Sequence, residues 1–138
     1  MGAAECCARR VPLAFSGMQW TIDGRTFGMN EVAPNEVVSA GSTHVWEFVN
    51  VAGGMGLQAA HPMHLHGRQF RVLGRSGASS NTLRDGISDA GWIDTVLVLP
   101  GETVRVQVTF SRQVGTFMYH CHILEHEDMG MMRNFRVV

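Results

Sequence analysis

The sequence contains few cysteines, and their spacing does not suggest that they pair. Among its 138 residues there are three, two adjacent near the start and one far away at Cys121. Neither an even disulfide framework nor the CxxC spacing of zinc fingers and redox motifs is present. We therefore expect a fold that needs no disulfide bonds. Cys6 and Cys7 lie in a polar terminal stretch and receive no functional assignment.

The chain also lacks a charge run and a long apolar run. Its net charge is −1, from 11 basic and 12 acidic residues, so nothing indicates a nucleic-acid or anionic-membrane partner. No apolar segment approaches the roughly 20 residues of a membrane span. The first 17 residues contain no apolar stretch long enough for a signal peptide. The length favours a single domain with its own core.

Short runs of β-type residues, separated by turn signals, dominate what is present. We predict strands at residues 18–22, 25–29, 37–38, 43–49, 69–73, 93–99, 103–110, 115–119 and 134–138. Asp23-Gly24 would join the first two in a hairpin. A helical turn is expected at residues 123–128 and a long surface loop at residues 76–89. Roughly eight short strands indicate an all-β antiparallel sandwich or barrel over residues 18–138, preceded by a disordered or irregular segment, residues 1–17.

Histidines are concentrated in two short clusters. HPMHLHG occupies residues 61–67, HCHILEHEDMGMM occupies residues 120–132, and together they hold six of the seven histidines. Imidazoles with one thiolate and a weak thioether are the ligand set of an electron-transfer copper. Cys121, His126, a methionine of the second cluster and one histidine of the first cluster would supply it.

Strand alternation divides the remaining histidines between two faces. If the HLH triplet at residues 64–66 is extended, its two histidines point to one face and its leucine to the other. The HCH triplet at residues 120–122 likewise sends its histidines one way and Cys121 the other. His61, set apart by Pro62, is then the natural partner of Cys121. A second site would be formed by four converging imidazoles, those of His64, His66, His120 and His122.

These two motifs closely resemble the last copper-binding motifs of multicopper oxidases, the family of laccases, bilirubin oxidase, ascorbate oxidase and bacterial cuprous oxidases. The resemblance covers about residues 18–138 and includes GWIDTV at residues 91–96, while HEDMGMM resembles the cuprous-oxidase branch. It implies a cupredoxin-like Greek-key fold, copper as the cofactor, and a periplasmic or extracellular location.

The resemblance also implies a role for each ligand. A type 1 copper, which accepts single electrons from the substrate, would be held by His61, Cys121 and His126, with Met131 as the axial ligand. Electrons would pass through the HCH segment to a trinuclear copper site, where O2 is reduced to water. That site would receive His64 as a type 2 ligand and three type 3 ligands, His66, His120 and His122. Glu127 is a hypothetical proton relay towards bound oxygen.

The trinuclear site implied by the resemblance is incomplete in this chain. Such a site takes eight histidines, four of them from two HxH motifs on a first domain, and His44 is the one histidine left here. We therefore expect preceding cupredoxin domains or partner chains, with a small molecule or cuprous ion as electron donor. Two alternatives are a free-standing blue-copper electron carrier, and a β domain whose histidines bind zinc or nothing.

Overall fold

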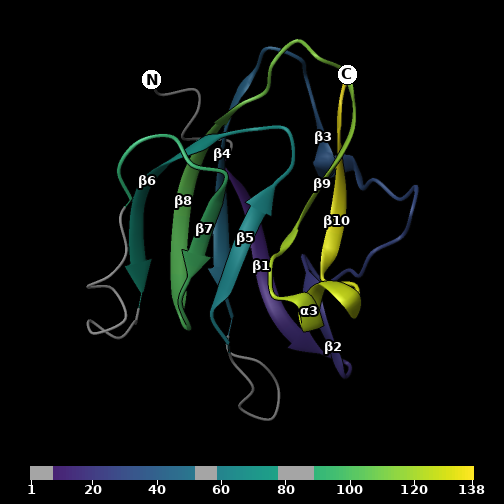
Figure 1. The fold of residues 1–138 in the computed structure, drawn as a ribbon, viewed down its shortest axis with the longest axis vertical. Helices are drawn as coiled ribbons and strands as arrows, with labels where there is room; N and C mark the ends of the chain where they lie inside the picture. The colour runs from purple at the N-terminus through teal and green to yellow at the C-terminus, as the bar shows by residue number, and fades with distance from the viewer. Residues whose placement is uncertain (1–7, 52–58, 78–88) are drawn as a thin grey trace.

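The computed structural model describes residues 8–51, 59–77 and 89–138, which fold into two five-stranded sheets (Figure 1). The first sheet has the order β2 (Gln19–Ile22), β1 (Arg9–Ser16), β4 (Thr43–Asn50), β8 (Glu102–Thr109) and β6 (Phe70–Gly77). The second has the order β3 (Val37–Val38), β10 (Met132–Val137), β9 (Gly115–Cys121), β5 (His61–Leu65) and β7 (Thr95–Val98). The predicted all-β class is confirmed, and β1 and β5 are strands that the sequence analysis did not count.

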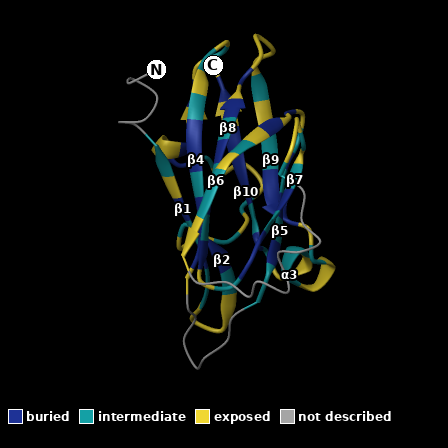
Figure 2. Cartoon of the chain, turned by 90° about the vertical axis from the view of Figure 1, so that its left-hand side faces the viewer, coloured by how far each residue is buried: buried dark blue, intermediate teal, exposed yellow. Residues whose placement is uncertain are grey.

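The core lies between the two sheets. Val104, Val106 and Val108 alternate along β8 and are 0% exposed, and Figure 2 shows buried residues following the strands. The Trp46 ring of β4 meets the Tyr119 ring of β9 at a centroid distance of 5.3 Å, across the interior. Each fully buried side chain of this size stabilises the fold by about 1.5–3 kcal/mol. This packing fixes β9, which carries Cys121.

The prediction of an irregular segment over residues 1–17 does not hold for Arg9–Ser16, which form β1. This strand pairs in parallel with β4 and antiparallel with β2. Pro12 lies in its middle and lacks an N–H, but its carbonyl accepts a hydrogen bond of 2.8 Å from the Asp23 N–H. The ordered domain therefore begins earlier than the sequence analysis placed it. Residues 1–7, with Cys6 and Cys7, lie outside the described residues.

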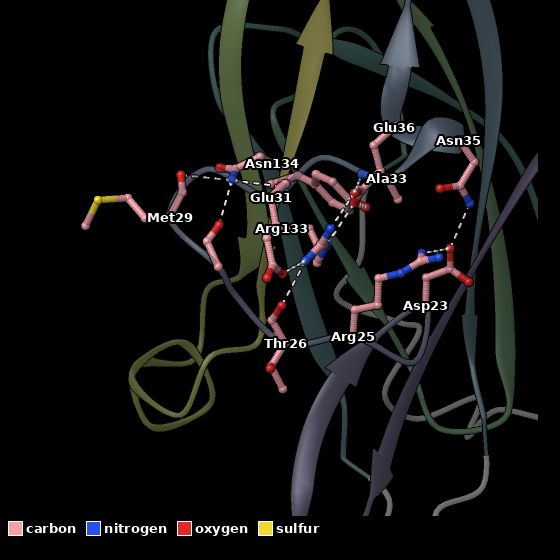
Figure 3. A network of polar contacts seen from close by, with 12 residues as sticks. Asp23, Arg25, Thr26, Met29, Glu31, Ala33, Asn35, Glu36, Arg133 and Asn134 are labelled. Atoms are coloured by element: carbon pink, nitrogen blue, oxygen red, sulfur yellow. Dashed lines mark hydrogen bonds and ion pairs between the residues drawn. The ribbon is translucent and has the colours of Figure 1, made fainter.

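Of the hairpin predicted around Asp23-Gly24, the structure contains the turn but not the second strand. Ile22 and Arg25 exchange backbone hydrogen bonds of 2.9 and 3.0 Å, but residues 26–29 form no strand. The side-chain amide of Asn134 instead donates to three carbonyls of this segment (Figure 3), those of Gly28, Met29 and Glu31. The segment is thus held on β10 by a side chain rather than by a ladder of backbone bonds. The actual hairpin joins β1 and β2.

A buried ionic network ties this segment to both sheets (Figure 3). The Glu36 carboxylate, at the end of a 3-10 turn (Pro34–Glu36), is 0% exposed and accepts hydrogen bonds of 2.7 and 3.1 Å from Arg133. The Tyr119 hydroxyl donates to the same carboxylate at 2.6 Å, and Arg9 donates to that hydroxyl at 2.6 Å. Burial raises the pKa of Glu36, but these hydrogen bonds and the Arg133 charge outweigh it and hold the pKa below its ordinary value.

The predicted helical turn is confirmed as α3 (Leu124–Asp128), between β9 and β10. Its N-cap, Ile123, offers no side-chain hydrogen bond, so tertiary contacts must hold the helix in place. None of the helices within the described residues is long and apolar enough to cross a membrane. Of the loop predicted at residues 76–89, the first two residues belong to β6, and residues 78–88 lie outside the described residues.

Candidate metal centre

Two neighbouring strands determine which way the histidines point. β5 and β9 are antiparallel, with Met63 opposite Cys121 and His64 opposite His120. Residues directly opposite each other on antiparallel strands share a face. Met63 and Cys121 are 0% exposed and face the core, so His64 and His120 face away from it. The alternation read from the sequence is therefore the alternation of the folded strands.

One group of ligand atoms, which we call the sulfur site, consists of His61, Cys121 and His126. The Cys121 Sγ lies 3.5 Å from the Nδ1 atom of His61 and 3.6 Å from that of His126. All three ligand atoms lie within 4.8 Å of one another. His61 begins β5, Cys121 ends β9 and His126 lies on α3, so three elements meet here. His61 and Cys121 are fully buried, whereas His126 is half-buried.

Met131 is a buried methionine of the second cluster whose backbone is bonded to the sulfur site. It is 0% exposed, whereas Met129 is 52% exposed. The Met131 N–H donates to the His126 carbonyl at 2.9 Å, and the Met131 carbonyl accepts the Cys121 N–H at 3.2 Å. Its backbone is thus bonded to two residues of the sulfur site. Burial and these bonds give a structural reason for choosing Met131 that spacing alone did not.

The environment of the sulfur site keeps its groups uncharged. Burial, aided by the charge of nearby His126, lowers the pKa of His61 to about 4. Burial raises the pKa of the Cys121 thiol to about 11, opposed by a backbone hydrogen bond from Ile123 and assisted by the Glu127 charge. At neutral pH the imidazole of His61 therefore has a free lone pair. A cation that binds the sulfur must displace the thiol proton.

A second group, which we call the imidazole site, gathers histidine side chains on the outer face of β5 and β9. His64, His66 and His120 present ring nitrogens within 4.8 Å of one another. The Nε2 atoms of His66 and His120 lie 2.8 Å apart. Burial, followed by the charges of neighbouring imidazoles, lowers the pKa of His66. Imidazole nitrogens this close together are arranged as ligands to a metal would be.

Backbone carbonyls set the tautomers of two of these histidines. The Nδ1 of His64 lies 2.9 Å from the Asp94 carbonyl and 3.1 Å from the Thr95 hydroxyl. The Nδ1 of His120 lies 3.1 Å from the Cys121 carbonyl. A carbonyl only accepts, so each Nδ1 carries the proton and each Nε2 carries the lone pair, which in His120 faces the His66 Nε2. Hydrogen bonds of this kind orient metal-binding histidines.

The remaining predicted residues lie at different distances from these groups. The His122 ring is 5.6 Å from the His64 ring and 5.4 Å from the His120 ring, so His122 borders the imidazole site without joining its close set of nitrogens. Glu127 reaches from α3 to place a carboxylate oxygen 3.7 Å from the His120 Nδ1. His44 lies apart on β4, where its Nε2 meets the Ser42 hydroxyl at 2.8 Å.

Together, the fold and both sites form a β-sandwich with two candidate metal sites, and comparisons with known proteins assign its family. The family model of the multicopper oxidases matches residues 10–138. A laccase of Haloferax volcanii is 44% identical over 117 residues, and a multicopper oxidase of Staphylococcus aureus is 40% identical over 119 residues. Each alignment covers 85% of this chain, but only 19% and 24% of those proteins.

A solved laccase structure from Pediococcus acidilactici aligns with a TM-score of 0.78 at 37% identity, over 95% of this chain and 26% of that one. The chain therefore belongs to the multicopper oxidase family, and the predicted cupredoxin-like fold class is confirmed. It spans between 19% and 26% of the length of these three relatives.

The residues present fit the copper that the family implies. A buried cysteine with two imidazoles is a soft donor set, and the imidazole site offers nitrogen ligands that copper also accepts. The buried Nε2 of His61 has no hydrogen-bond partner among the described residues, which leaves its Nδ1 as the ligand atom next to the sulfur.

Two contacts at these sites were not predicted from the sequence. Trp20 packs its ring against His61 and His126. The Asp94 carbonyl, rather than the carboxylate, makes the shorter contact to the His64 ring, since Oδ1 is 3.8 Å away. Every residue has a backbone carbonyl, so the residue types in the sequence do not reveal this contact. Trp20 precedes His61 by 41 positions and His126 by 106, so only the fold brings these rings together.

Proposed function

We propose that this chain is the C-terminal copper-binding domain of a larger multicopper oxidase. Its sulfur site would hold the type 1 copper, with Met131 as the axial ligand. Its imidazole site, together with the bordering His122, would supply half of a trinuclear site: His64 for the type 2 copper and three ligands for the type 3 pair. The type 3 ligands are His66, His120 and His122. The preceding domains would supply the other half, and O2 and a reducing substrate would be the reactants.

The observation that supports this proposal is the division of ligands between the two faces of one strand pair. The sulfur site contains one cysteine and two histidines on the buried side, while the imidazole site opens outward with no sulfur among its ligand atoms. Imidazoles that face outward are accessible to a second domain, which would add the remaining ligands of the trinuclear site. The size of the relatives, several times that of this chain, leaves room for one.

Bound copper would supply the one-electron chemistry and the reduction of O2 to water. His126 is the half-exposed histidine of the sulfur site, so an external donor would reach the site through its imidazole. The Cys121 backbone is bonded directly to His120 and His122, which gives electrons a covalent path towards the imidazole site. The carbonyls of Asp94 and Cys121 hold the Nδ1 protons of His64 and His120 in place.

An oxygen-uptake experiment tests the proposal. The copper-loaded chain alone should show no sustained donor-dependent O2 consumption, because half of the imidazoles are missing. Mixed with the N-terminal part of a related oxidase that carries two HxH motifs, it should consume O2 with four electrons per molecule. His66→Gln should abolish this uptake and leave the type 1 copper spectrum intact. Sustained turnover by the chain alone would contradict the half-site assignment.

The second candidate is a free-standing blue-copper electron carrier. It is favoured by one observation: His61, Cys121 and His126 form a complete ligand group within this chain. A carrier should exchange electrons with a redox partner whether or not a second domain is added. Recovery of O2 uptake in the mixture supports the oxidase domain. Unchanged electron exchange without any O2 uptake supports the carrier.

Replacing Glu127 tests the proton relay. Its carboxylate is half-buried and faces His120, a position from which it could deliver protons towards the imidazole site. Proton transfer by a positioned carboxylate contributes about 10²-fold or more to a rate, so Glu127→Gln should lower O2 uptake of the mixture on that scale. Asp128→Asn, at the exposed end of the same helix, is the matched control. Equal O2 uptake by the Gln variant and the unmodified chain would rule out the relay.

A further inference from the structure

Trp20 contacts both imidazoles of the sulfur site. Its ring stacks on the His126 ring with centroids 4.3 Å apart and an interplanar angle of 27°. It meets the His61 ring edge-on, at 5.1 Å and 72°. Trp20 belongs to β2 of the first sheet, whereas the sulfur site is built by β5, β9 and α3, and Figure 1 shows β2 beside α3. The contact therefore comes from outside the elements that carry the ligands.

The Trp20 ring is itself held in position. Phe15 lies directly opposite it in the β1–β2 hairpin, and the two rings meet edge-on at 5.0 Å and 63°. Trp20 is half-buried, so one part of the indole packs between Phe15 and the histidines while another part reaches the surface. Aromatic rings in such pairs prefer these stacked and edge-on arrangements. The hairpin thus presents a fixed surface to His126.

Within the described residues, no carbonyl or carboxylate holds the histidines of the sulfur site. A metal-binding histidine normally donates its second ring N–H to a carboxylate, carbonyl or water. Among the described residues, the buried Nε2 of His61 has no hydrogen-bond partner, and the His126 ring has no hydrogen-bond contact other than Cys121. His64 and His120, in the imidazole site, do have carbonyl partners. Ring packing by Trp20 is a contact from outside the sulfur site that both of its histidines share.

We propose that Trp20 is a positioning residue that orients the His126 imidazole, and through its edge contact the His61 imidazole, for copper ligation. This inference rests on the proposed function, because it requires copper at the sulfur site. Ring contacts from Trp20 take the place of the hydrogen bonds that the imidazole site receives from backbone carbonyls. The short α3 helix, which carries His126, has no side-chain N-cap, so the stacking of His126 on Trp20 is one of the tertiary contacts that hold it.

Copper binding to two Trp20 variants tests the proposal. Trp20→Phe keeps an aromatic face and should retain the affinity, visible spectrum, electron spin resonance spectrum and reduction potential of the unmodified chain. Trp20→Leu keeps an apolar cover but no ring, and should bind copper about 10-fold more weakly, the scale of losing an outer partner of a ligand. Its spectra and potential should shift as well. Trp92→Leu is the matched control, since Trp92 is 54% exposed and its ring contact is with Arg71.

The possible outcomes separate a failure of the Trp20 proposal from a failure of the proposed function. A colourless unmodified chain would overturn the copper assignment itself. A blue unmodified chain with an unaltered Trp20→Leu variant would overturn the role of Trp20 alone. Equal losses in the Phe and Leu variants would also contradict it, because the effect would then follow volume rather than stacking. Circular dichroism checks folding, and Trp20→Met, with a longer apolar side chain, replaces Leu if that variant is unfolded.

Discussion

Replacing Cys121 by Ser should abolish the blue copper of this chain. Cys121 supplies the one sulfur among the close ligand atoms of the sulfur site, and its Sγ lies 3.5 and 3.6 Å from two imidazole nitrogens. A serine hydroxyl is close in size but does not provide the soft, deprotonated ligand that this class of copper site requires. We expect complete loss of the intense visible band. Copper affinity should fall by more than the roughly 10–100-fold typical of losing an outer-shell partner.

The control for this prediction removes a histidine instead. His44 lies outside both sites, so His44→Gln should retain the visible band at full strength. Visible absorption after copper loading measures both variants, with circular dichroism to confirm that each is folded. A Cys121→Ser variant that remained blue would place the sulfur ligand elsewhere and contradict the assignment.

Replacing Glu36 by Gln should cost about 3–5 kcal/mol of unfolding free energy, the range for breaking one partner of a buried ion pair. The carboxylate accepts hydrogen bonds from Arg133, Tyr119 and the Ala33 N–H, and it is 0% exposed. Arg133 is 2% exposed, so the substitution leaves its charge buried with weaker compensation. Denaturant unfolding of the two chains measures the difference. A loss below about 1 kcal/mol would mean that the network behaves like a surface pair.

The same substitution should change the acid stability. The folded-state pKa of Glu36 is lowered, so its contribution to stability is present above its unfolded pKa of about 4.3 and is lost as the pH falls through the folded-state value. The unmodified chain should therefore lose this contribution below about pH 4.3, whereas Glu36→Gln should lack that part of the pH dependence. Glu47→Gln is the control, because Glu47 makes a partly exposed pair with Arg105 at 3.5 Å.

Alternation along single strands made the two ligand groups predictable. The side chains of HLH and HCH point according to a period of two, which depends on no distant residue. The same local rule identified most strands, including the alternating run in β8. It did not identify β1, in which Pro12 lacks the N–H of a ladder residue; in the fold the pairing of β1 with β2 begins only after it, at Leu13.

Long-range contacts could not be read from the sequence. Glu36 and Arg133 are 97 positions apart, and the sequence around either residue does not indicate its partner. Residues 26–29 have the composition of a strand. The Asn134 side-chain amide instead donates hydrogen bonds to three carbonyls of the segment that begins with these residues. Trp20 shows the same limit at the sulfur site, since its stacking on His126 depends on how the two sheets pack. Each of these features requires the fold before it can be recognised.

We propose that this one chain contains a complete type 1 copper site beside half of a trinuclear site. The decisive measurement is a titration of copper into the unmodified chain, with visible absorption and electron spin resonance recorded together. We expect one tightly bound blue copper per chain, with any further copper bound more loosely and without the blue band. A chain that stays colourless with bound copper, or that takes up no copper, would contradict it.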